Sequence, residues 1–483
     1  MNPDLLQQRV PGTAYRERVK PLVVDINSGL YLESGNDDMR FNRNYATGNA
    51  LPQSMIGLRP ILNEGSVEEI YELQLRISDT NRRVTELASF LGLEIPEIRP
   101  IYAVTDGNGM LCLNETKRLY TPYQQLRILN SLFPLANNQL PVYMAENLHL
   151  LKQAYPRLSI DPDLTTQSAE LTRRLNRKDV YYESVQNHIA VIPRHVETRL
   201  ARINDLPDSW EEFCTQYNVD WRKVVIKSAV DAGSEVNVIL TEESYLESLL
   251  ELRQQNAEKL QNPNREEENI PVLIQRFVET PKSEDVVKSF GVGLSIIPSG
   301  EVGIIALTSQ LYSDQYYVGS HLDVSEEAEI LDQIGRDRLV NLGRIFADQG
   351  YAGSVFFDGM NEIIDDEIIP LLIYDGNFRI SAAAFTLSVA SWLMRSGFEV
   401  SSITNVGYLG KYKHADISKL LTSLNNDGIL FDKRTGKGII PLPNATSPEG
   451  YDLVFVNCSR SEVISGWNKA LQYGSSDISN LHF

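Results

Sequence analysis

Two apolar segments, residues 354–360 and 371–379, each place an aspartate directly before a glycine. In the second segment Asp375, Asn377 and Arg379 are spaced two residues apart. Alternate side chains of an extended chain point to the same face, so these three polar groups would share one side of a strand. If the two segments are neighbouring strands, Asp358 joins them in an oxygen-rich cluster. This pairing restricts the fold and the chemistry more than any other feature of the chain.

An oxygen-rich cluster suits Mg²⁺, a hard cation that takes oxygen ligands while it keeps contact with substrate phosphates. Asp358, Asp375 and Asn377 are therefore candidate metal ligands. Arg379 beside them is placed to hold a transferring phosphoryl group or an acyl phosphate. The competing interpretation is a pair of turns, since Asp-Gly is a strong hairpin signal and occurs here twice. The sequence leaves both interpretations open.

Two lysines are candidates for phosphate binding. Lys227 ends the apolar run 224–227 and precedes a loop of small residues that contains Gly233 and Ser234. The lysine ammonium and the backbone N–H groups of such a loop suit phosphate oxygens. Lys178 lies earlier, at an expected helix start. Each lysine alone is more simply explained as a solvated side chain, so both would reach one triphosphate only if the intervening chain folds back.

A third candidate segment follows the apolar residues 271–274 and consists of Gln275, Arg276, Phe277, Val278 and Glu279. Its backbone groups would pair with the edge of an adenine, and its acidic end would meet ribose hydroxyls, if it is a hinge. The plainer interpretation is a core strand with a charged end. The segment does not distinguish the two by itself.

Composition excludes several classes of function. The 483 residues carry a net charge of -19, from 64 acidic and 45 basic side chains. A surface this negative repels a phosphate backbone, which argues against nucleic acid as a partner. The three cysteines share no spacing that fits a disulfide framework or a zinc site, so we expect a reduced, cytoplasmic setting. No window approaches ~20 uncharged apolar residues, so no membrane span is expected.

Length and local pattern predict an α/β (α+β) chain of several domains. We expect an N-terminal α/β domain, a central domain of alternating helices and strands, and a small C-terminal domain, at residues 1–165, 166–400 and 401–483. Residues 66–93 have helical spacing and begin with Ser66 in a capping-box pattern. The last residues, 475–483, are expected to fray.

The order of these features resembles that of the ATP-grasp superfamily. In sequence order they are a lysine at a helix start, a strand lysine with a small-residue loop, a hinge strand, a strand acid and an acid-x-Asn-x-Arg strand: Lys178, Lys227, residues 275–279, Asp358 and residues 375–379. Within the superfamily the chain is most similar to the pheganomycin-type peptide ligases, through residues 308–320 and 428–442. In those ligases the ATP-grasp domain lies between a pre-ATP-grasp domain and a small C-terminal domain.

The resemblance implies an ATP-dependent carboxylate–amine ligase that makes a peptide or amide bond in natural-product biosynthesis. ATP would phosphorylate a substrate carboxylate, and an amine would then attack the acyl phosphate, with release of ADP and phosphate. The implied cofactors are ATP and Mg²⁺. The implied partners are a small-molecule carboxylate and an amine, such as an amino acid or peptide, and a homodimer is compatible with the resemblance.

The resemblance also implies a role for each candidate residue. The phosphate ligands would be Lys178, Lys227, Gly233 and Ser234, the adenosine site residues 275–279, the metal ligands Asp358, Asp375 and Asn377, and the catalytic residues Arg379 and Lys227. Two departures from the family pattern stand out. The family usually carries glutamate where this chain has Asp375, and the loop after Lys227 has a single glycine where such loops are often richer.

Two alternatives share part of this interpretation. In the first, the activated acyl group passes to the thiol of a carrier protein instead of an amine. In the second, the chain binds a nucleotide without catalysis, which the departure at Asp375 keeps open. The sequence hardly separates the amine from the thiol acceptor, because the acceptor would dock on the terminal domains.

Overall fold

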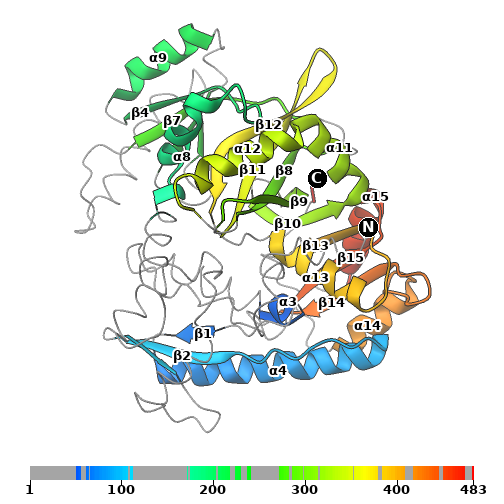
Figure 1. The fold of residues 1–483 in the computed structure, drawn as a ribbon. Helices are drawn as coiled ribbons and strands as arrows, with labels where there is room; N and C mark the ends of the chain where they lie inside the picture. The colour runs from blue at the N-terminus through cyan, green and yellow to red at the C-terminus, as the bar shows by residue number, and fades with distance from the viewer. Residues whose placement is uncertain are drawn as a thin grey trace.

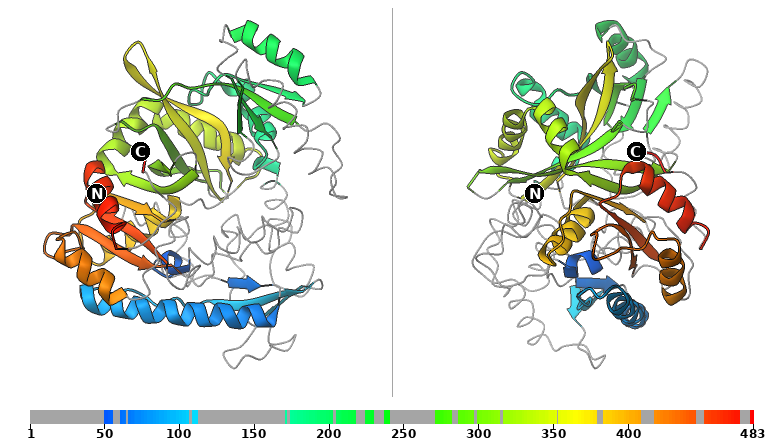
Figure 2. Two further views of the ribbon diagram at one scale, coloured as in Figure 1. Left: turned by 180° about the vertical axis from the view of Figure 1, so that it is seen from behind. Right: turned by 90° about the vertical axis from the view of Figure 1, so that its right-hand side faces the viewer.

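In the computed structural model the described residues form helices and three β-sheets, which confirms the predicted α/β class. The described residues are 50–55, 61–64, 66–106, 109–112, 171, 174–202, 205–217, 224–229, 237–240, 271–281, 286–296, 299–313, 316–351, 353–378, 383–407, 417–444, 450–473 and 481–483. Figures 1 and 2 show helix α9 at one end of the molecule and helix α4 at the other, with the largest sheet between them.

The described N-terminal elements are the short helix α3 (Ala50–Met55), a small sheet and the long helix α4 (Val67–Leu91). As the capping pattern predicts, α4 begins after Ser66, whose Oγ accepts a hydrogen bond from the backbone N–H of Glu69 at 3.2 Å. It ends at Gly92, whose φ of 63° lies in the left-handed region that glycine adopts readily. The small sheet has the order β1-β2-β3, with strands Ile61–Glu64, Ile101–Asp106 and Gly109–Cys112.

A four-stranded antiparallel sheet has the order β4-β7-β5-β6. Its strands are Thr198–Arg202, Pro271–Arg276, Val224–Ser228 and Asn237–Leu240. Helix α9 (Leu206–Tyr217) packs against β4, and helix α8 (Lys178–Val185) contacts β7. Lys227 lies on β5 of this sheet, near the first residues of α8.

An eight-stranded sheet has the order β12-β11-β8-β9-β10-β13-β15-β14. Its strands, in that order, are Glu367–Asn377, Gly353–Ile364, Ser289–Ile296, Val302–Ser313, Tyr316–Asp323, Ser402–Val406, Tyr451–Val456 and Gly438–Pro443. Strand β10 pairs antiparallel with β13, so the sheet runs without interruption across residue 400.

The β11–β12 hairpin decides between the two interpretations of the Asp-Gly pairs. Its turn lies at Asp365 and Asp366, which both have positive φ (51° and 65°), as a tight two-residue hairpin turn requires. Asp358 and Asp375 lie inside the two strands, which are antiparallel neighbours. The turn interpretation of the two Asp-Gly pairs is therefore excluded, and the predicted adjacency of the two strands is confirmed.

Five further α-helices are described, several of which pack on the eight-stranded sheet. They are α11 (Val324–Ile334), α12 (Arg336–Ala347), α13 (Ala383–Arg395), α14 (Ile417–Asn426) and α15 (Arg460–Ala470). Helices α11 and α12 pack on β9, and α13 packs on β10 and β13 as well as on α3. One hydrophobic cluster joins α4 to β14, β15, α13 and α15, so the N-terminal helix and the C-terminal segment share a core.

The C-terminal residues 481–483 are docked rather than frayed. The backbone of His482 exchanges two hydrogen bonds with Tyr312 of β9, at 3.0 and 2.8 Å. Phe483 is buried and lies edge-on to His321, with ring centroids 5.4 Å apart. The expectation of fraying is wrong for these three residues, because apolar burial of Leu481 and Phe483 anchors them.

Among the described helices, none has the length and apolar character needed to cross a membrane.

Candidate active site

Four of the predicted charged residues meet where α8, β5, β11 and β12 come together. Lys178 is the first residue of α8, and its Nζ lies 3.5 Å from Oδ2 of Asp375 on β12. The backbone N–H of Lys178 donates to the carbonyl of Ala229, directly after β5, at 2.9 Å. This bond ties the start of α8 to the strand that carries Lys227. The chain therefore folds back as the two-lysine interpretation requires.

The predicted metal ligands form one cluster. The pairing of β11 with β12 is irregular beside Asp358, since Phe357 pairs with Gly376 and Gly359 with Leu372, so the extra residues of this bulge lie in β12. Oδ2 of Asp358 accepts a hydrogen bond from Nδ2 of Asn377 at 3.4 Å, and its Oδ1 accepts one from Nε2 of Gln310 at 2.8 Å. Both donors are neutral amides, so they orient the carboxyl group without balancing its charge.

The electrostatics of the cluster are those of a crowded polar site. Burial, and then the negative charge of Asp375, raise the pKa of Asp358 to about 7, against the opposing effects of Gln310, Lys227 and Lys178. Burial also lowers the pKa of Lys227, and Lys178 adds to this, while Asp375 and Asp358 oppose it. Burial is the largest cause of both pKa shifts, and a like-charged neighbour adds to each of them.

A divalent cation fits the donor set of this cluster. Two carboxylates and one amide supply the oxygen ligands that Mg²⁺ prefers, and the remaining positions would belong to water and phosphate oxygens. The amide of Asn377 points its nitrogen at Asp358, and a half-turn of that amide would present its oxygen instead. Among the described residues no group of three or more His, Cys, Asp and Glu side chains could hold a metal ion.

The predicted adenosine segment lies at the end of β7, between β4 and β5. Gln275 is buried, and its Nε2 donates to Oγ1 of Thr198 at 3.0 Å. Arg276 forms ion pairs with Glu197 before β4 and with Glu362 on β11. Both side chains are therefore engaged within the protein and fix the backbone of the segment, which leaves backbone groups for any contact with a base.

The last part of the segment is less enclosed. Phe277 is half-buried, Val278 is buried and Glu279 is exposed. The carbonyl of Glu279 accepts a hydrogen bond from the backbone N–H of Ile363 on β11 at 3.4 Å. The segment thus links the four-stranded and eight-stranded sheets, as a hinge between them would.

An aromatic layer lies behind Asp375. Tyr181 is buried, and its ring contacts those of Phe357, Tyr374 and Phe378. Its hydroxyl lies 2.8 Å from Nε2 of His195, whose Nδ1 lies 2.8 Å from the carbonyl of Pro193. Burial lowers the pKa of His195 to about 4, so the imidazole is neutral and has a structural role in this layer.

Three predicted residues, Gly233, Ser234 and Arg379, lie outside the described residues. The sequence reasoning also missed a contact. Gln310 of β9 received no role, although it donates a hydrogen bond to Asp358. The signal that could have identified it is the alternation of polar side chains Thr308, Gln310 and Tyr312, which lie in the second half of β9.

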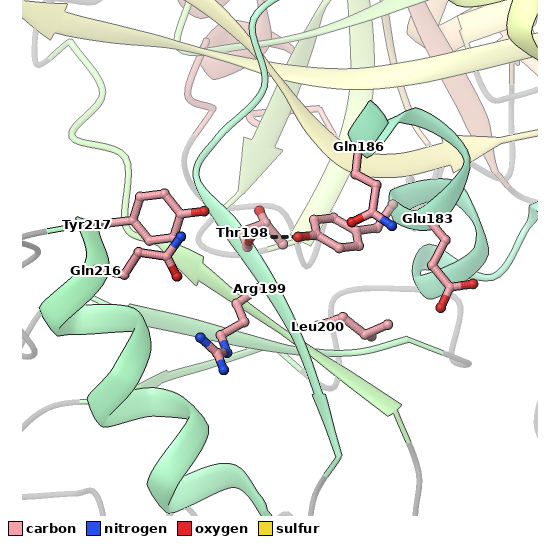
Figure 3. A pocket seen from close by; sticks show the side chains of 8 residues that line it. Glu183, Gln186, Thr198, Arg199, Leu200, Gln216 and Tyr217 are labelled. Carbon is pink, nitrogen blue, oxygen red and sulfur yellow. Dashed lines mark hydrogen bonds between the residues drawn. The ribbon is translucent and has the colours of Figure 1, made fainter. Parts of the chain in front are cut away.

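A separate hollow of about 340 Å³ lies beside the edge strand β4. Figure 3 shows Glu183 of α8 and Gln186, the residue after α8, on one side of this strand, and Gln216 and Tyr217 of α9 on the other. The hydroxyl of Tyr182 donates to the carbonyl of Thr198 at 3.2 Å within it. None of the predicted site residues lines this hollow.

No protein-family model matches the chain, and no curated protein matches it either. Several solved structures are similar to it. The N5-carboxyaminoimidazole ribonucleotide synthetase from Thermus thermophilus has 12% identity over 89% of this chain and 96% of its own, with a TM-score of 0.46. The corresponding Staphylococcus aureus synthetase, complexed with ADP, has 10% identity over 88% and 95%, with a TM-score of 0.44.

A third similar structure is the biotin carboxylase domain of the Hydrogenobacter thermophilus 2-oxoglutarate carboxylase, in complex with MgADP, ADP and bicarbonate. It has 11% identity over 91% of this chain and 90% of its own, with a TM-score of 0.48.

Proposed function

We propose that this chain is an ATP-dependent carboxylate–amine ligase of the ATP-grasp type, which works through an acyl phosphate and releases ADP and phosphate. One observation carries the proposal. Lys178 of α8 and Lys227 of β5 converge on a carboxyl pair whose members, Asp358 and Asp375, come from two adjacent strands. Two cations beside two carboxylates are the charges needed to hold a triphosphate with a divalent cation.

The role of each group follows from its charge and position. Lys178 and Lys227 would bind phosphate oxygens and orient the triphosphate. Asp358, Asp375 and Asn377 would hold Mg²⁺, which neutralises phosphate charge when it is bound. The backbone of residues 275–279 would bind adenosine, with Gln275 and Arg276 fixing that backbone through their own side-chain partners. Gly233 and Ser234 complete the proposed phosphate loop.

The proposed chemistry needs little covalent participation by the protein. A substrate carboxylate oxygen attacks the terminal phosphorus and ADP leaves, and an amine then attacks the acyl carbon, loses a proton and expels phosphate. Arg379 is proposed to stabilise the acyl phosphate. The protein contributes positioning and electrostatic stabilisation, which are large effects in phosphoryl transfer.

The finer parts of the proposal are the peptide or amide product, a place in natural-product biosynthesis, a cytoplasmic setting and a homodimer. The division at residues 165 and 400 is proposed for the domains, with the addition that the eight-stranded sheet joins the central and C-terminal parts. The negative net charge of -19 favours small-molecule substrates over nucleic acid.

The test is ADP release by the full chain with ATP, Mg²⁺ and pools of carboxylates and amines, followed by mass spectrometry of the products. We expect ADP release to depend on both a carboxylate and an amine, with a new amide in the product. A product found on the phosphopantetheine thiol of an added carrier protein would replace the amine by a thiol acceptor. ADP release at background with every pool, while nucleotide still binds, would leave a nucleotide-binding protein without catalysis.

A further inference from the structure

Gln310 reaches Asp358 from two strands away. Asp358 is on β11 and Gln310 on β9, and strand β8 lies between them. Neighbouring strands lie about 4.8 Å apart, so the two side chains span a gap of roughly 10 Å. The residue of β8 opposite Asp358 is Gly291, which has no side chain to block the path. A Cβ on Gly291 would lie 3.8 Å from Nε2 of Gln310 and 3.9 Å from Oδ1 of Asp358.

The amide of Gln310 is oriented from its other end. The hydroxyl of Tyr312 donates to Oε1 of Gln310 at 2.8 Å, while Nε2 donates to Asp358 at 2.8 Å. A phenol offers a proton and a carboxylate only accepts one, so this is the amide orientation that satisfies both partners. The opposite orientation would bring Oε1 against the carboxylate oxygen.

Tyr312 is itself held in place. Its backbone exchanges two hydrogen bonds with His482 of the docked C-terminal residues. Its ring lies edge-on to that of Tyr317, with centroids 6.2 Å apart. The bonded series Tyr312, Gln310 and Asp358 therefore begins at a fixed backbone and ends at a proposed cation ligand.

We propose that Gln310, oriented by Tyr312, is a positioning residue that aims the carboxylate of Asp358 at the divalent cation. This inference rests on the proposed function, since it assigns Gln310 a part in the same site. Gln310 does not contact the cation, and acts through Asp358. Groups that orient a metal ligand by hydrogen bonding typically change metal affinity or activity by 10–100-fold when they are removed.

The test measures binding of Mn²⁺ with ADP by electron paramagnetic resonance, which reports the cation directly and needs no turnover. We expect Gln310→Met, which keeps the side-chain length without the hydrogen bonds, to weaken Mn²⁺ binding about 10–100-fold. Tyr312→Phe should weaken it by about 3–10-fold, because it frees the amide to rotate. Far-ultraviolet circular dichroism would check that each variant is folded.

A double-mutant cycle separates positioning from a general structural effect. If Tyr312 acts through Gln310, Tyr312→Phe should change Mn²⁺ affinity less than twofold in the Gln310→Met background. Gln333→Met and Tyr473→Phe are matched controls on distant surfaces, where Gln333 bonds Glu329 and Tyr473 bonds Asp427. Both should bind Mn²⁺ as the wild type does.

The outcomes distinguish this inference from the proposed function. If the wild type binds Mn²⁺ with ADP and Asp358→Asn abolishes binding, while Gln310→Met binds normally, the positioning role is refuted and the ligase proposal stands. Equal effects of Tyr312→Phe in both backgrounds would also refute it. If the wild type itself shows no bound Mn²⁺ with ADP, the proposed function fails first.

Discussion

Two aspartates of this molecule have pKa values raised to nearly the same level by burial and very different surroundings. The pKa of Asp358 is raised to about 7 by burial and then by Asp375. The pKa of Asp452 on β15 is also raised to about 7, by burial. Both carboxyl groups accept hydrogen bonds from an amide, Gln310 for Asp358 and Asn444 for Asp452.

The two aspartates differ in the charged groups that lie near them. Asp358 keeps a partly exposed surface and shares its site with two lysines and a second carboxylate. Asp452 is 5% exposed, and burial and the Asn444 amide account for its shift. A raised pKa therefore marks burial, whereas the convergence of opposite charges marks a candidate site. The comparison predicts that Asp358 affects function and Asp452 affects stability.

The largest expected effect is loss of ADP release in Asp358→Asn. Removing the charge of a metal ligand should lower the rate about 10³-fold or more, because the cation that neutralises the phosphates is lost. Asp375→Ala and Asn377→Ala should also lower the rate of ADP release. Asp452→Asn, the matched control, should keep its rate within twofold. Equal losses in the Asp358 and Asp452 variants would show that both groups act through the fold alone.

The next largest expected effect concerns Lys227, a positive charge near Asp358 that has no counterpart near Asp452 among the described residues. Lys227→Ala should weaken ATP binding about 100-fold, the usual value of a charge-assisted contact to phosphate. Titration calorimetry with ATP measures it. Lys437→Ala is the control, since Lys437 is exposed and pairs with Glu462 at 2.6 Å. An unchanged ATP affinity in Lys227→Ala would move the phosphate site elsewhere.

The sequence predicts the strands of the site well, because a run of apolar residues is a local signal. It did not decide whether the two Asp-Gly pairs form turns or lie inside strands, since the same dipeptide is compatible with both. In the structure Gly359 is needed for packing, as a Cβ there would lie 2.3 Å from the ring of Phe290. The turn is made instead by Asp365 and Asp366. A local signal cannot report which side chain approaches from another strand.

Other parts of the site depend on contacts between distant strands. Gln310 meets Asp358 across Gly291 of the intervening strand β8, a contact that no single segment reveals. The docking of His482 on Tyr312 and the burial of Asp452 are likewise properties of the assembled sheet. Candidate residues of the site could be named from the sequence, whereas the hydrogen-bond partners and pKa shifts of those that the structure describes could not.

The third prediction tests the other half of the comparison. Asp452→Asn should stabilise the protein above pH 7 by roughly 2 kcal/mol. A shift from 3.8 to about 7 would be worth about 4 kcal/mol, and a weakened hydrogen bond from Asn444 offsets about half of it. The folded state binds the proton more tightly, so wild-type stability falls as pH rises from about 4 to about 7.

Chemical denaturation of the wild type and Asp452→Asn across this pH range provides the measurement. The difference in free energy of unfolding should grow from pH 4 and level off above pH 7. A difference that is constant with pH would mean that Asp452 is ionised in both states and that burial does not raise its pKa.

The smallest effect compares two buried threonines, one beside Asp358 and one remote from it. Oγ1 of Thr308 is buried and has no hydrogen-bond partner among the described residues, and it lies 3.8 Å from the position that a Cβ on Gly291 would take. Oγ1 of Thr386 lies 2.5 Å from Oγ of Ser320, which is also buried. Thr308→Val should therefore raise the free energy of unfolding by about 1 kcal/mol, since it removes an unsatisfied hydroxyl.

Thr386→Val should lower the free energy of unfolding by about 1–2 kcal/mol, because it leaves Ser320 without its hydrogen-bond partner. Thermal unfolding of the two variants gives both signs in one experiment. Valine has nearly the shape of threonine, so the sign reports the hydroxyl rather than the packing. Destabilisation by Thr308→Val would show that its hydroxyl is satisfied in solution, and the space beside Gly291 and Asp358 would then hold an ordered polar group even without substrate.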